Sequence, residues 1–290
     1  MKRIVLATLC LFAFAAPALA QDIPAAIVRD PVVDPAHKAT MEVVHIPTHG
    51  LLINGVLYKA GGPGLHPTVV LYHGLPGNEQ NLDLAQAMRR DGWNVLTLHY
   101  RGSWGSPGDY SFTHVFEDAQ AGLDFVRDPA NAAKYGVDTH KIVVVGHSLG
   151  GMAASFVGDH NSDLAGVGMI SAANFAMFGH GMARPQLVQF MSENMESLNT
   201  TSEKMADEAM AGAAGWNFVT FAPNLAKHPL LLVTSDDGLA GASNALAKAD
   251  RDTRGAPVTE VHLATDHSYS DHRIALEAAV IHWLDGLSAR

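Results

Sequence analysis

The sequence predicts a doubly wound α/β fold with a mostly parallel central sheet. The first observation is a pair of continuous apolar runs, TVVLY at 68–72 and KIVVV at 141–145, which suit strands buried on both faces by helices. The second is that segments with strand character alternate with segments whose apolar residues recur at helical spacing. The third is length, since 290 residues can bury the core of one large α/β domain.

The expected elements follow this alternation along the chain. Strands are predicted at 41–46, 51–58, 68–72, 94–99, 141–145, 164–170, 229–233 and 258–263. Helices are predicted at 81–90, 115–127, 148–157 and 274–287. Residues 21–40 are rich in Pro and Ala and are expected to form an extended arm. The domain is therefore expected to span 21–290, with helices on both faces of the sheet.

Residues 175–228 interrupt the alternation, because they contain no good strand. Helices are predicted there at 186–198 and 202–214, the second with Ser202 as its N-cap. A helical insertion between two strands is usually a lid or side subdomain. The segment is rich in Met, a flexible residue that can line an adaptable apolar site or fill the insertion's own core. Both interpretations stay open.

The first twenty residues have the layout of a secretory signal peptide. Lys2 and Arg3 precede an apolar run at 4–16, and Ala18-Leu19-Ala20 forms a small-x-small cleavage signal. Cleavage is expected after Ala20, because the apolar run is shorter than a membrane-spanning helix normally requires. The sequence therefore predicts a secreted or periplasmic protein. Its single cysteine lies in this segment, so no disulfide framework is expected.

Charge and motif content argue against several classes of partner. The chain has 19 Lys and Arg against 29 Asp and Glu, a net charge of −10, which disfavours nucleic acid and anionic membranes. Its 16 histidines include no H-E-x-x-H pair, so no metal site is expected. No G-x-G-x-x-G, the motif of a dinucleotide-binding site, follows the first parallel strand, so no dinucleotide cofactor is expected. No other cofactor is expected either. The oligomeric state is left open.

The motif with the clearest chemistry is Gly146-His147-Ser148-Leu149-Gly150, between the KIVVV strand and a predicted helix. In this setting the serine sits on a sharp, strained turn that exposes its hydroxyl, and its near neighbours must be small to avoid clashes. The helix N-terminus that follows favours negative charge. The pattern predicts Ser148 as a catalytic nucleophile.

On this motif the chain resembles the α/β-hydrolase superfamily, from about residue 41 to the end except for the insertion. The resemblance implies an oxyanion hole on the loop that follows an early strand, here His73-Gly74-Leu75-Pro76-Gly77 after TVVLY. The two donors would be the backbone N–H groups of Leu75 and Leu149.

The resemblance also implies that a triad acid and then a histidine follow Ser148 in the chain. The segment PLLLVTSDDG offers Asp236 and Asp237 just beyond a strand. The family often has Gly-x-x-Asp here, but Ser235 stands at the Gly position, so strict spacing would end on Gly238. Asp237 is favoured and Asp236 remains the alternative, since adjacent residues at a strand end point in opposite directions.

The base implied by the superfamily lies on the loop after the last strand. His267 fits, because it follows Asp266 and precedes the small Ser268. His272 would open the final helix, and His262 lies in the strand and is assigned a structural role.

The segment Tyr100-Arg101-Gly102-Ser103-Trp104-Gly105 resembles a loop of the prolyl-oligopeptidase branch and its esterase relatives. This resemblance implies that Arg101 and Trp104, together with His73, lie near the substrate pocket. The alternative is a loop packed on the edge of the sheet. Leu149 stands where the branch's peptidases commonly have Tyr, and only about 20 residues separate the expected cleavage site from the first strand. Both departures weaken a peptidase assignment.

These observations support three functional hypotheses. The first is a carboxylesterase-like serine hydrolase, in which Ser148 forms an acyl-enzyme, His267 moves the proton and Asp237 orients His267. The second is an amidase or exopeptidase-like enzyme with the same residues. The third is a binding protein on a hydrolase scaffold. The expected substrate is a small-molecule ester or amide.

Overall fold

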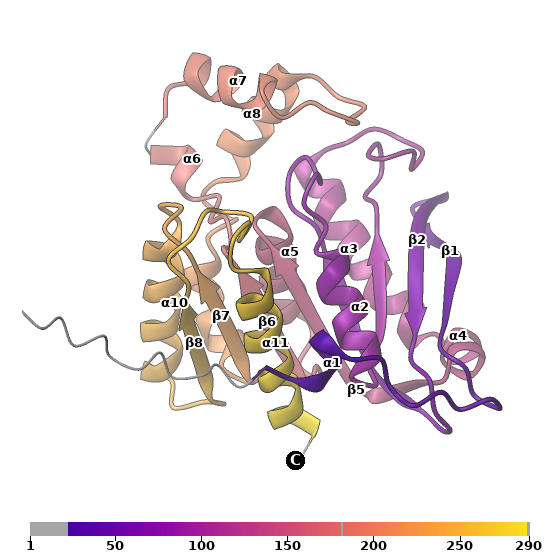
Figure 1. Cartoon of the computed structure of the whole chain (residues 1–290). Helices are drawn as coiled ribbons and strands as arrows, with labels where there is room; N and C mark the ends of the chain where they lie inside the picture. Colours follow the sequence, from indigo (N-terminus) through magenta and orange to yellow (C-terminus); the bar gives the residue numbers. More distant parts are fainter. Residues whose placement is uncertain (1–22, 181, 289–290) are drawn as a thin grey trace, which may run out of the picture.

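An eight-stranded mixed sheet forms the centre of the molecule (Figure 1). This computed structural model describes residues 23–180 and 182–288, so the predicted signal peptide at 1–20 lies outside the described residues. The strands are β1 (Thr40–Thr48), β2 (Leu51–Lys59), β3 (His66–Tyr72), β4 (Asn94–Leu98), β5 (Val137–His147), β6 (Gly166–Ile170), β7 (Leu230–Thr234) and β8 (Val258–His262).

The strand order is β1-β2-β4-β3-β5-β6-β7-β8. The pairs β1/β2 and β2/β4 are antiparallel, and every pair from β4 to β8 is parallel. The predicted mostly parallel α/β fold is therefore confirmed. The carboxyl ends of β3, β5, β7 and β8 lie at the same edge of the sheet, where side chains from distant parts of the chain can meet.

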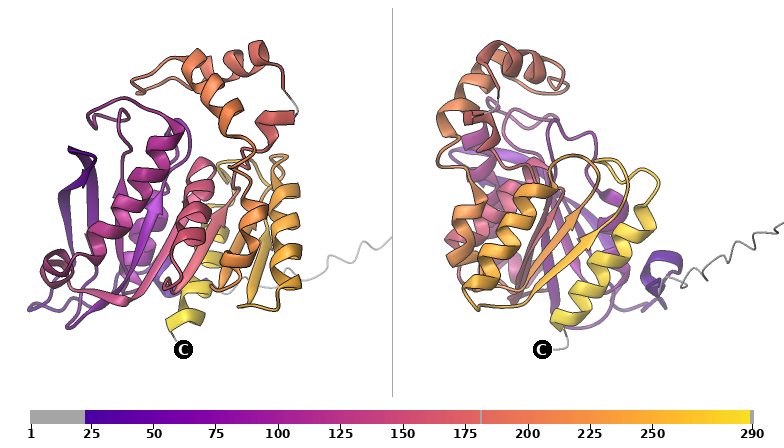
Figure 2. Two further views of the ribbon diagram at one scale, coloured as in Figure 1. Left: turned by 180° about the vertical axis from the view of Figure 1, so that it is seen from behind. Right: turned by 90° about the vertical axis from the view of Figure 1, so that its left-hand side faces the viewer.

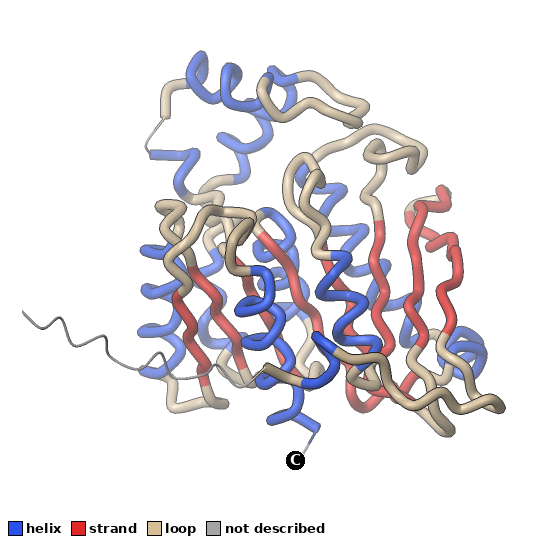
Figure 3. Tube along the Cα trace, viewed as in Figure 1, coloured by secondary structure: helices blue, strands red, loops and turns tan. Residues whose placement is uncertain are grey.

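Helices lie on both sides of this sheet (Figures 2 and 3). They are α1 (Ala25–Val28), α2 (Leu82–Arg90), α3 (Phe112–Arg127), α4 (Pro129–Tyr135), α5 (Leu149–His160), α6 (Met177–His180), α7 (Arg184–Ser192), α8 (Ser202–Gly212), the 3-10 helix η1 (Phe218–Phe221), α9 (Ala222–Leu225), α10 (Ala240–Asp252) and α11 (Arg273–Ser288). Among the described residues, no helix is long and apolar enough to cross a membrane.

The core consists of two apolar layers divided by the sheet. Successive residues of a strand point to opposite faces, and β5 shows the consequence. Ile142 and Val144 join the layer that contains residues of α3, α5 and α10, whereas Val143 and Val145 join the layer formed with α2 and α11. Every side chain of the KIVVV run after Lys141 is therefore buried, as expected for a strand covered on both faces.

Several boundaries differ from the sequence prediction. The arm at 21–40 contains the short helix α1, and helices α4 and α10 were not predicted. Signals for α4 were present in the sequence: Asp128 accepts hydrogen bonds from the N–H groups of Ala130 and Asn131, Pro129 occupies the first turn, and Gly136 ends the helix with φ +69°.

Helices α6, α7 and α8 form a cap above the carboxyl edge of the sheet (Figure 1). The first of the two predicted helices, α7, ends at Ser192 rather than at 198, and the N-cap of α8 is Thr201 rather than Ser202. The carboxylate of Glu208 on α8 accepts hydrogen bonds of 2.8 and 2.9 Å from the N–H groups of Phe112 and Thr113. The cap is therefore attached to the N-terminus of α3, where a negative charge is stabilising.

Candidate active site

Ser148 lies on a strained turn between β5 and α5. Its φ is +57° and its ψ is −119°, a backbone conformation that non-glycine residues rarely adopt. A Cβ atom on Gly146 would collide with the main-chain oxygen of Gly150, and one on Gly150 would collide with the main-chain oxygen of Tyr72. The two glycines are required because the strand, turn and helix pass so close to one another. This is the local geometry predicted from the motif.

The serine opens onto a cavity of about 330 Å³ between the sheet edge and the cap. The lining residues are Leu75, Phe112, Ser148, Leu149, Ala173, Phe175, Met177, Phe178, Met182, Phe190, Met191, Asn194, Asp237, Leu239 and His267. Five residues predicted from the sequence, including both proposed oxyanion-hole residues, are thus brought to one cavity. A larger groove of about 560 Å³ lies beside the β1–β2 turn and α3, but none of these five residues lines it.

Asp237 and His267 are joined by a hydrogen bond of 2.7 Å between Oδ2 and Nδ1. The Asp237 side chain is 4% exposed and that of His267 is 39% exposed, so the carboxylate lies behind the ring and the ring faces the cavity. Asp236 has a side chain that is 66% exposed and contacts Nε2 of His262 at 3.2 Å. Of the two adjacent carboxylates, only Asp237 reaches His267 in the structure.

The environment of Asp237 favours its ionised form. Burial opposes the charge, but hydrogen bonds from His267, the N–H of Leu239 and Ser171 outweigh burial and hold the pKa of Asp237 below its usual value. The Oγ atom of Ser171 lies 2.8 Å from the hydroxyl of Tyr269 and 2.9 Å from that of Ser235. The Asp237 carboxylate therefore lies beside a buried cluster formed by the hydroxyl groups of Ser171, Ser235 and Tyr269. Ser171 and Tyr269 were not identified as site residues from the sequence.

Two backbone donors flank the serine. Within the described part of the chain, the N–H groups of Leu75 and Leu149 donate to no protein acceptor, and both residues line the cavity. A Cβ atom on Gly74 would lie 2.9 Å from Cβ and 3.5 Å from Oγ of Ser148. The loop can approach the serine closely because residue 74 has no side chain. Two unpaired donors beside a serine hydroxyl can stabilise a developing oxyanion.

His73 and Trp104 were expected near the substrate, but neither lines the cavity. The His73 ring is buried against Tyr100, with 4.6 Å between ring centroids, and burial lowers the pKa of His73 to about 4. Nε1 of Trp104 donates a 2.7 Å hydrogen bond to the main-chain oxygen of Pro76. Both rings instead contact the 73–77 loop: a Cβ atom on Gly77 would lie 2.6 Å from Nε1 of Trp104 and 2.7 Å from Nδ1 of His73.

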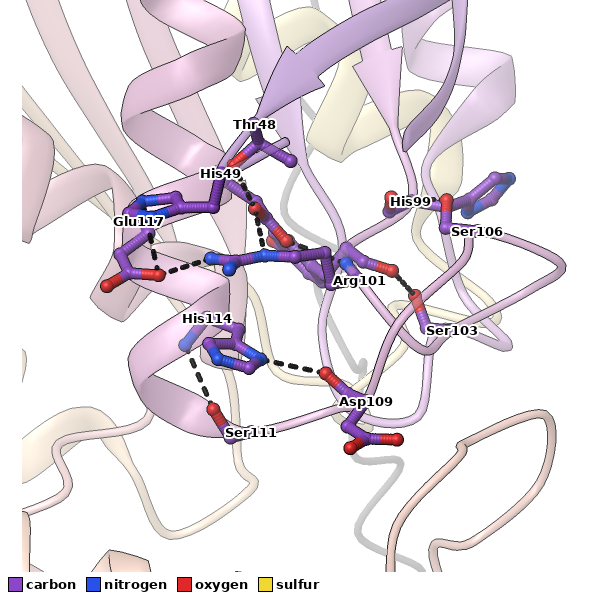
Figure 4. A network of polar contacts seen from close by, with 12 residues as sticks. Thr48, His49, His99, Arg101, Ser103, Ser106, Asp109, Ser111, His114 and Glu117 are labelled. Carbon is purple, nitrogen blue, oxygen red and sulfur yellow. Dashed lines mark hydrogen bonds and ion pairs between the residues drawn. The ribbon is translucent and has the colours of Figure 1, made fainter. Parts of the chain in front are cut away.

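Arg101 does not line the cavity either, and Figure 4 shows that it belongs to a network of polar contacts. Its Nε donates a 2.7 Å hydrogen bond to Asp118, its other guanidinium edge pairs with Glu117, and Thr48 donates to Asp118 at 2.8 Å. Arg101 was expected near the substrate pocket, but its charge is instead balanced by carboxylates within the protein. The buried ion pair joins the end of β1, the 99–110 loop and α3, which agrees with the alternative of a loop packed on the sheet.

The cap contributes side chains that the sequence did not assign to the site. Met177, Met182 and Met191 line the cavity, whereas Met205 is fully buried elsewhere in the core. The methionines therefore serve both of the roles left open. Asn194 also lines the cavity and is the only uncharged polar side chain that the described cap residues contribute to it. Among the described residues, no group of three or more His, Cys, Asp or Glu could hold a metal ion.

Comparison with known proteins places this geometry in a family. The model of the BD-FAE family matches residues 65–209, which include the 73–77 loop, the serine turn and most of the cap. The chain belongs to the BD-FAE family. It is thus a member of a carboxylesterase-like family of serine hydrolases with the α/β-hydrolase fold.

Individual proteins are also similar to this BD-FAE protein in sequence or in fold. The α/β hydrolase domain-containing protein WAV2 of Arabidopsis thaliana is 33% identical over 99 residues, which is 33% of this chain and only 30% of the length of WAV2. The carboxylesterase EstE1, cloned from a metagenomic library, is 25% identical with a TM-score of 0.62, over 90% of this chain and 92% of that one. Est1E of Butyrivibrio proteoclasticus with bound ferulic acid has a TM-score of 0.67 at 19% identity, over 85% of this chain and 100% of that one.

Proposed function

We propose that this protein hydrolyses carboxylic esters through Ser148, His267 and Asp237. The observation that carries the proposal is the 2.7 Å hydrogen bond between Asp237 and His267 on the wall of the cavity onto which Ser148 opens. A nucleophile, a base and a carboxylate that orients the base are the parts that acyl transfer requires. Membership of a carboxylesterase-like family supports the same reaction.

In the proposed mechanism, Nε2 of His267 accepts the proton of the Ser148 hydroxyl as its oxygen attacks the ester carbonyl carbon. The carbonyl oxygen becomes negatively charged and accepts hydrogen bonds from the N–H groups of Leu75 and Leu149. His267 then gives the proton to the departing alcohol, and an acyl-enzyme remains on Ser148. A water molecule, deprotonated by His267, attacks the acyl carbon; the bond to Oγ of Ser148 breaks, the acid is released, and His267 returns the proton to the serine oxygen. Asp237 stabilises the imidazolium form of His267 in both steps.

The cavity supports a compact aromatic or branched apolar acid as the acyl part of the substrate. Its walls carry Phe112, Phe175, Phe178 and Phe190, with flexible methionines between them. Aromatic side chains offer faces and edges for a second ring, and Met adapts to its outline. The relative Est1E has been solved with ferulic acid, an aromatic acid with a ring hydroxyl. We therefore propose esters of ferulic acid type as substrates, with Asn194 as a polar partner for a ring substituent.

The test compares matched esters and amides on purified protein. We expect hydrolysis of methyl ferulate and 4-nitrophenyl acetate, slower or no hydrolysis of the corresponding amides, and labelling of Ser148 by a fluorophosphonate probe. Ser148→Ala should lose at least about a thousandfold in kcat, as serine deletions in other triads do, while keeping its fold. Ser155→Ala, at a serine about two turns further along α5, is the control and should remain active. An active Ser148→Ala protein would overturn the proposal.

We also propose that the protein is exported after cleavage behind Ala20. The support is the basic start, the apolar run and the Ala18-Leu19-Ala20 signal in the sequence. N-terminal sequencing of the mature protein tests this, and Gln21 should be its first residue. Full-length protein retained in the cytoplasm would contradict it.

A further inference from the structure

His147, the residue before the serine, contacts the loop that carries the base. It is the last residue of β5 and is 3% exposed. Its Nε2 atom lies 2.8 Å from the main-chain oxygen of His267, and the two imidazole rings are 4.7 Å apart between centroids. One residue therefore connects the turn of the nucleophile with the main chain of the proposed base, although 120 positions separate them.

The direction of this hydrogen bond determines the state of His147. A carbonyl oxygen can only accept, so Nε2 carries the hydrogen and donates it. In the neutral ring Nδ1 is then an unprotonated acceptor, and among the described residues this buried atom has no partner. An unpaired buried acceptor is unfavourable for stability, so an apolar residue would suit this position better if only packing mattered.

The surroundings of His147 keep its ring neutral. Burial lowers the pKa of His147 to about 3, and the nearby His267 and Arg273 side chains act in the same direction, whereas the hydrogen bond to the His267 carbonyl and the charge of Asp237 oppose them. The Tyr269 ring also lies near the His147 ring in an edge-on arrangement, with centroids 6.5 Å apart. Neutrality matters because His267 becomes positively charged during the proposed reaction, and a second positive ring at this distance would oppose that step.

We infer that His147 is a positioning residue, which holds the main chain of His267 through its Nε2–H while it remains uncharged. The inference rests on the proposed function. His267 is then fixed at two points: Asp237 holds its ring at Nδ1, and His147 holds its carbonyl. Since the His267 side chain is 39% exposed, packing alone leaves it free on one side, and the second attachment limits how the loop can move.

The test separates the hydrogen bond from packing and charge. In His147→Gln, the side-chain amide nitrogen can occupy the position of Nε2 and donate to the same carbonyl. In His147→Phe the ring volume is kept but the donor is lost, and in His147→Asn the donor is too short to reach. We expect kcat within about threefold of wild type for His147→Gln and about 10–100-fold lower for the other two, as for small displacements of catalytic groups elsewhere.

A positioning role predicts which kinetic parameters change. KM should stay within about twofold in all three variants, because His147 does not line the cavity. The exposed His140→Gln is the control and should match wild type. Melting temperatures establish that each variant is folded.

The possible outcomes distinguish this inference from the proposed function. A wild-type protein that neither hydrolyses esters nor reacts with a fluorophosphonate refutes the proposed function. An active wild type with wild-type kcat in folded His147→Phe refutes the positioning role. Equal loss in folded His147→Gln and His147→Asn also refutes it, because the donor would then not be the relevant feature. If His147→Phe does not fold, the comparison of Gln with Asn decides.

Discussion

Oδ2 of Asp237 and Nδ1 of His267 lie 2.7 Å apart, although the two residues are 30 positions apart in the sequence. They meet because β7 and β8 are parallel neighbours, so the loops that follow both strands leave the same edge of the sheet. Asp236, next in the chain, turns outward to His262. The alternation of side chains at the strand end thus selects one carboxylate of two.

The first prediction follows from this selection. Asp237→Asn should lower kcat far more than Asp236→Asn, because an amide no longer stabilises the imidazolium or holds the correct tautomer of His267. The corresponding change in a serine protease costs about 10⁴ in kcat. Steady-state kinetics of the two single variants and the double variant on one ester measure the effect. A larger loss in Asp236→Asn, or full kcat in the double variant, would place the acid elsewhere.

The second prediction concerns the two histidines of the β8–α11 loop. His267→Ala should reduce kcat about as much as Ser148→Ala, by a thousandfold or more, because the serine then has no base. His272→Ala is the matched control and should stay near wild type, since Nδ1 of His272 pairs with the exposed carboxylate of Asp271 at 2.8 Å and His272 does not line the cavity.

The dependence on pH provides a second measurement for the histidine. A protonated imidazole cannot accept the serine proton, so kcat/KM should fall as the solution becomes acidic through the range in which histidines titrate. A level profile down to pH 4 on folded protein would be incompatible with a histidine base.

The third prediction concerns the close approach of the 73–77 loop to the serine. Gly74→Ala places a methyl group 2.9 Å from Cβ of Ser148, so either the nucleophile or the loop must shift. We expect kcat to fall about 10–100-fold, as for small displacements in other active sites. Gly241→Ala on α10 is the control, because no atom lies within 4 Å of the added Cβ there. Unchanged kcat in a folded Gly74→Ala protein would show that the loop can adjust without loss.

The fourth prediction concerns stability and pH at the contact between α2 and α11. Burial and the negative charge of Asp285 raise the pKa of Asp91 to about 7, with a smaller opposing effect of His282. Burial and Asp83 likewise raise the pKa of Glu277 to about 7. In unfolded chains such carboxyls ionise near pH 4. The folded state therefore binds more protons between about pH 4 and 7, and the stability that these groups add is present at acidic pH and lost as pH rises to about 7.

Asp91→Asn tests this linkage, because its amide stays uncharged beside Asp285. The melting temperature at pH 8 should rise by about 2–4 °C, and its decrease between pH 5 and pH 8 should become smaller. The effect is modest because Asp91 is only half-buried and solvent screens the repulsion. Asp30→Asn, which removes a charge from the exposed arm, is the control. A variant with the wild-type pH dependence would mean that Asp91 does not contribute.

Parts of the site were predictable because they obey local rules. The serine turn needs small residues at fixed offsets around Ser148, and Gly146 and Gly150 supply them in the sequence itself. The loop at 73–77 was also predictable, because it directly follows the buried apolar run at 68–72. For Arg101 and Trp104 the motif indicated a loop near the site but not the direction of the two side chains. Packing decides that direction, and both side chains contact other parts of the protein.

The sequence by itself determined the alternation of buried strands and helices, the strained serine turn and the chain order of the proposed nucleophile, acid and base. Each of these features depends on residues that are close together in the chain, because the spacing of apolar residues and the positions of glycines determine local structure. Only the tertiary structure placed Asp237 rather than Asp236 against His267, directed Arg101 into an ion pair with Asp118, and brought Nε2 of His147 to the carbonyl of His267. These contacts depend on which strands lie side by side and on the direction of each side chain at a strand end, which no local pattern specifies.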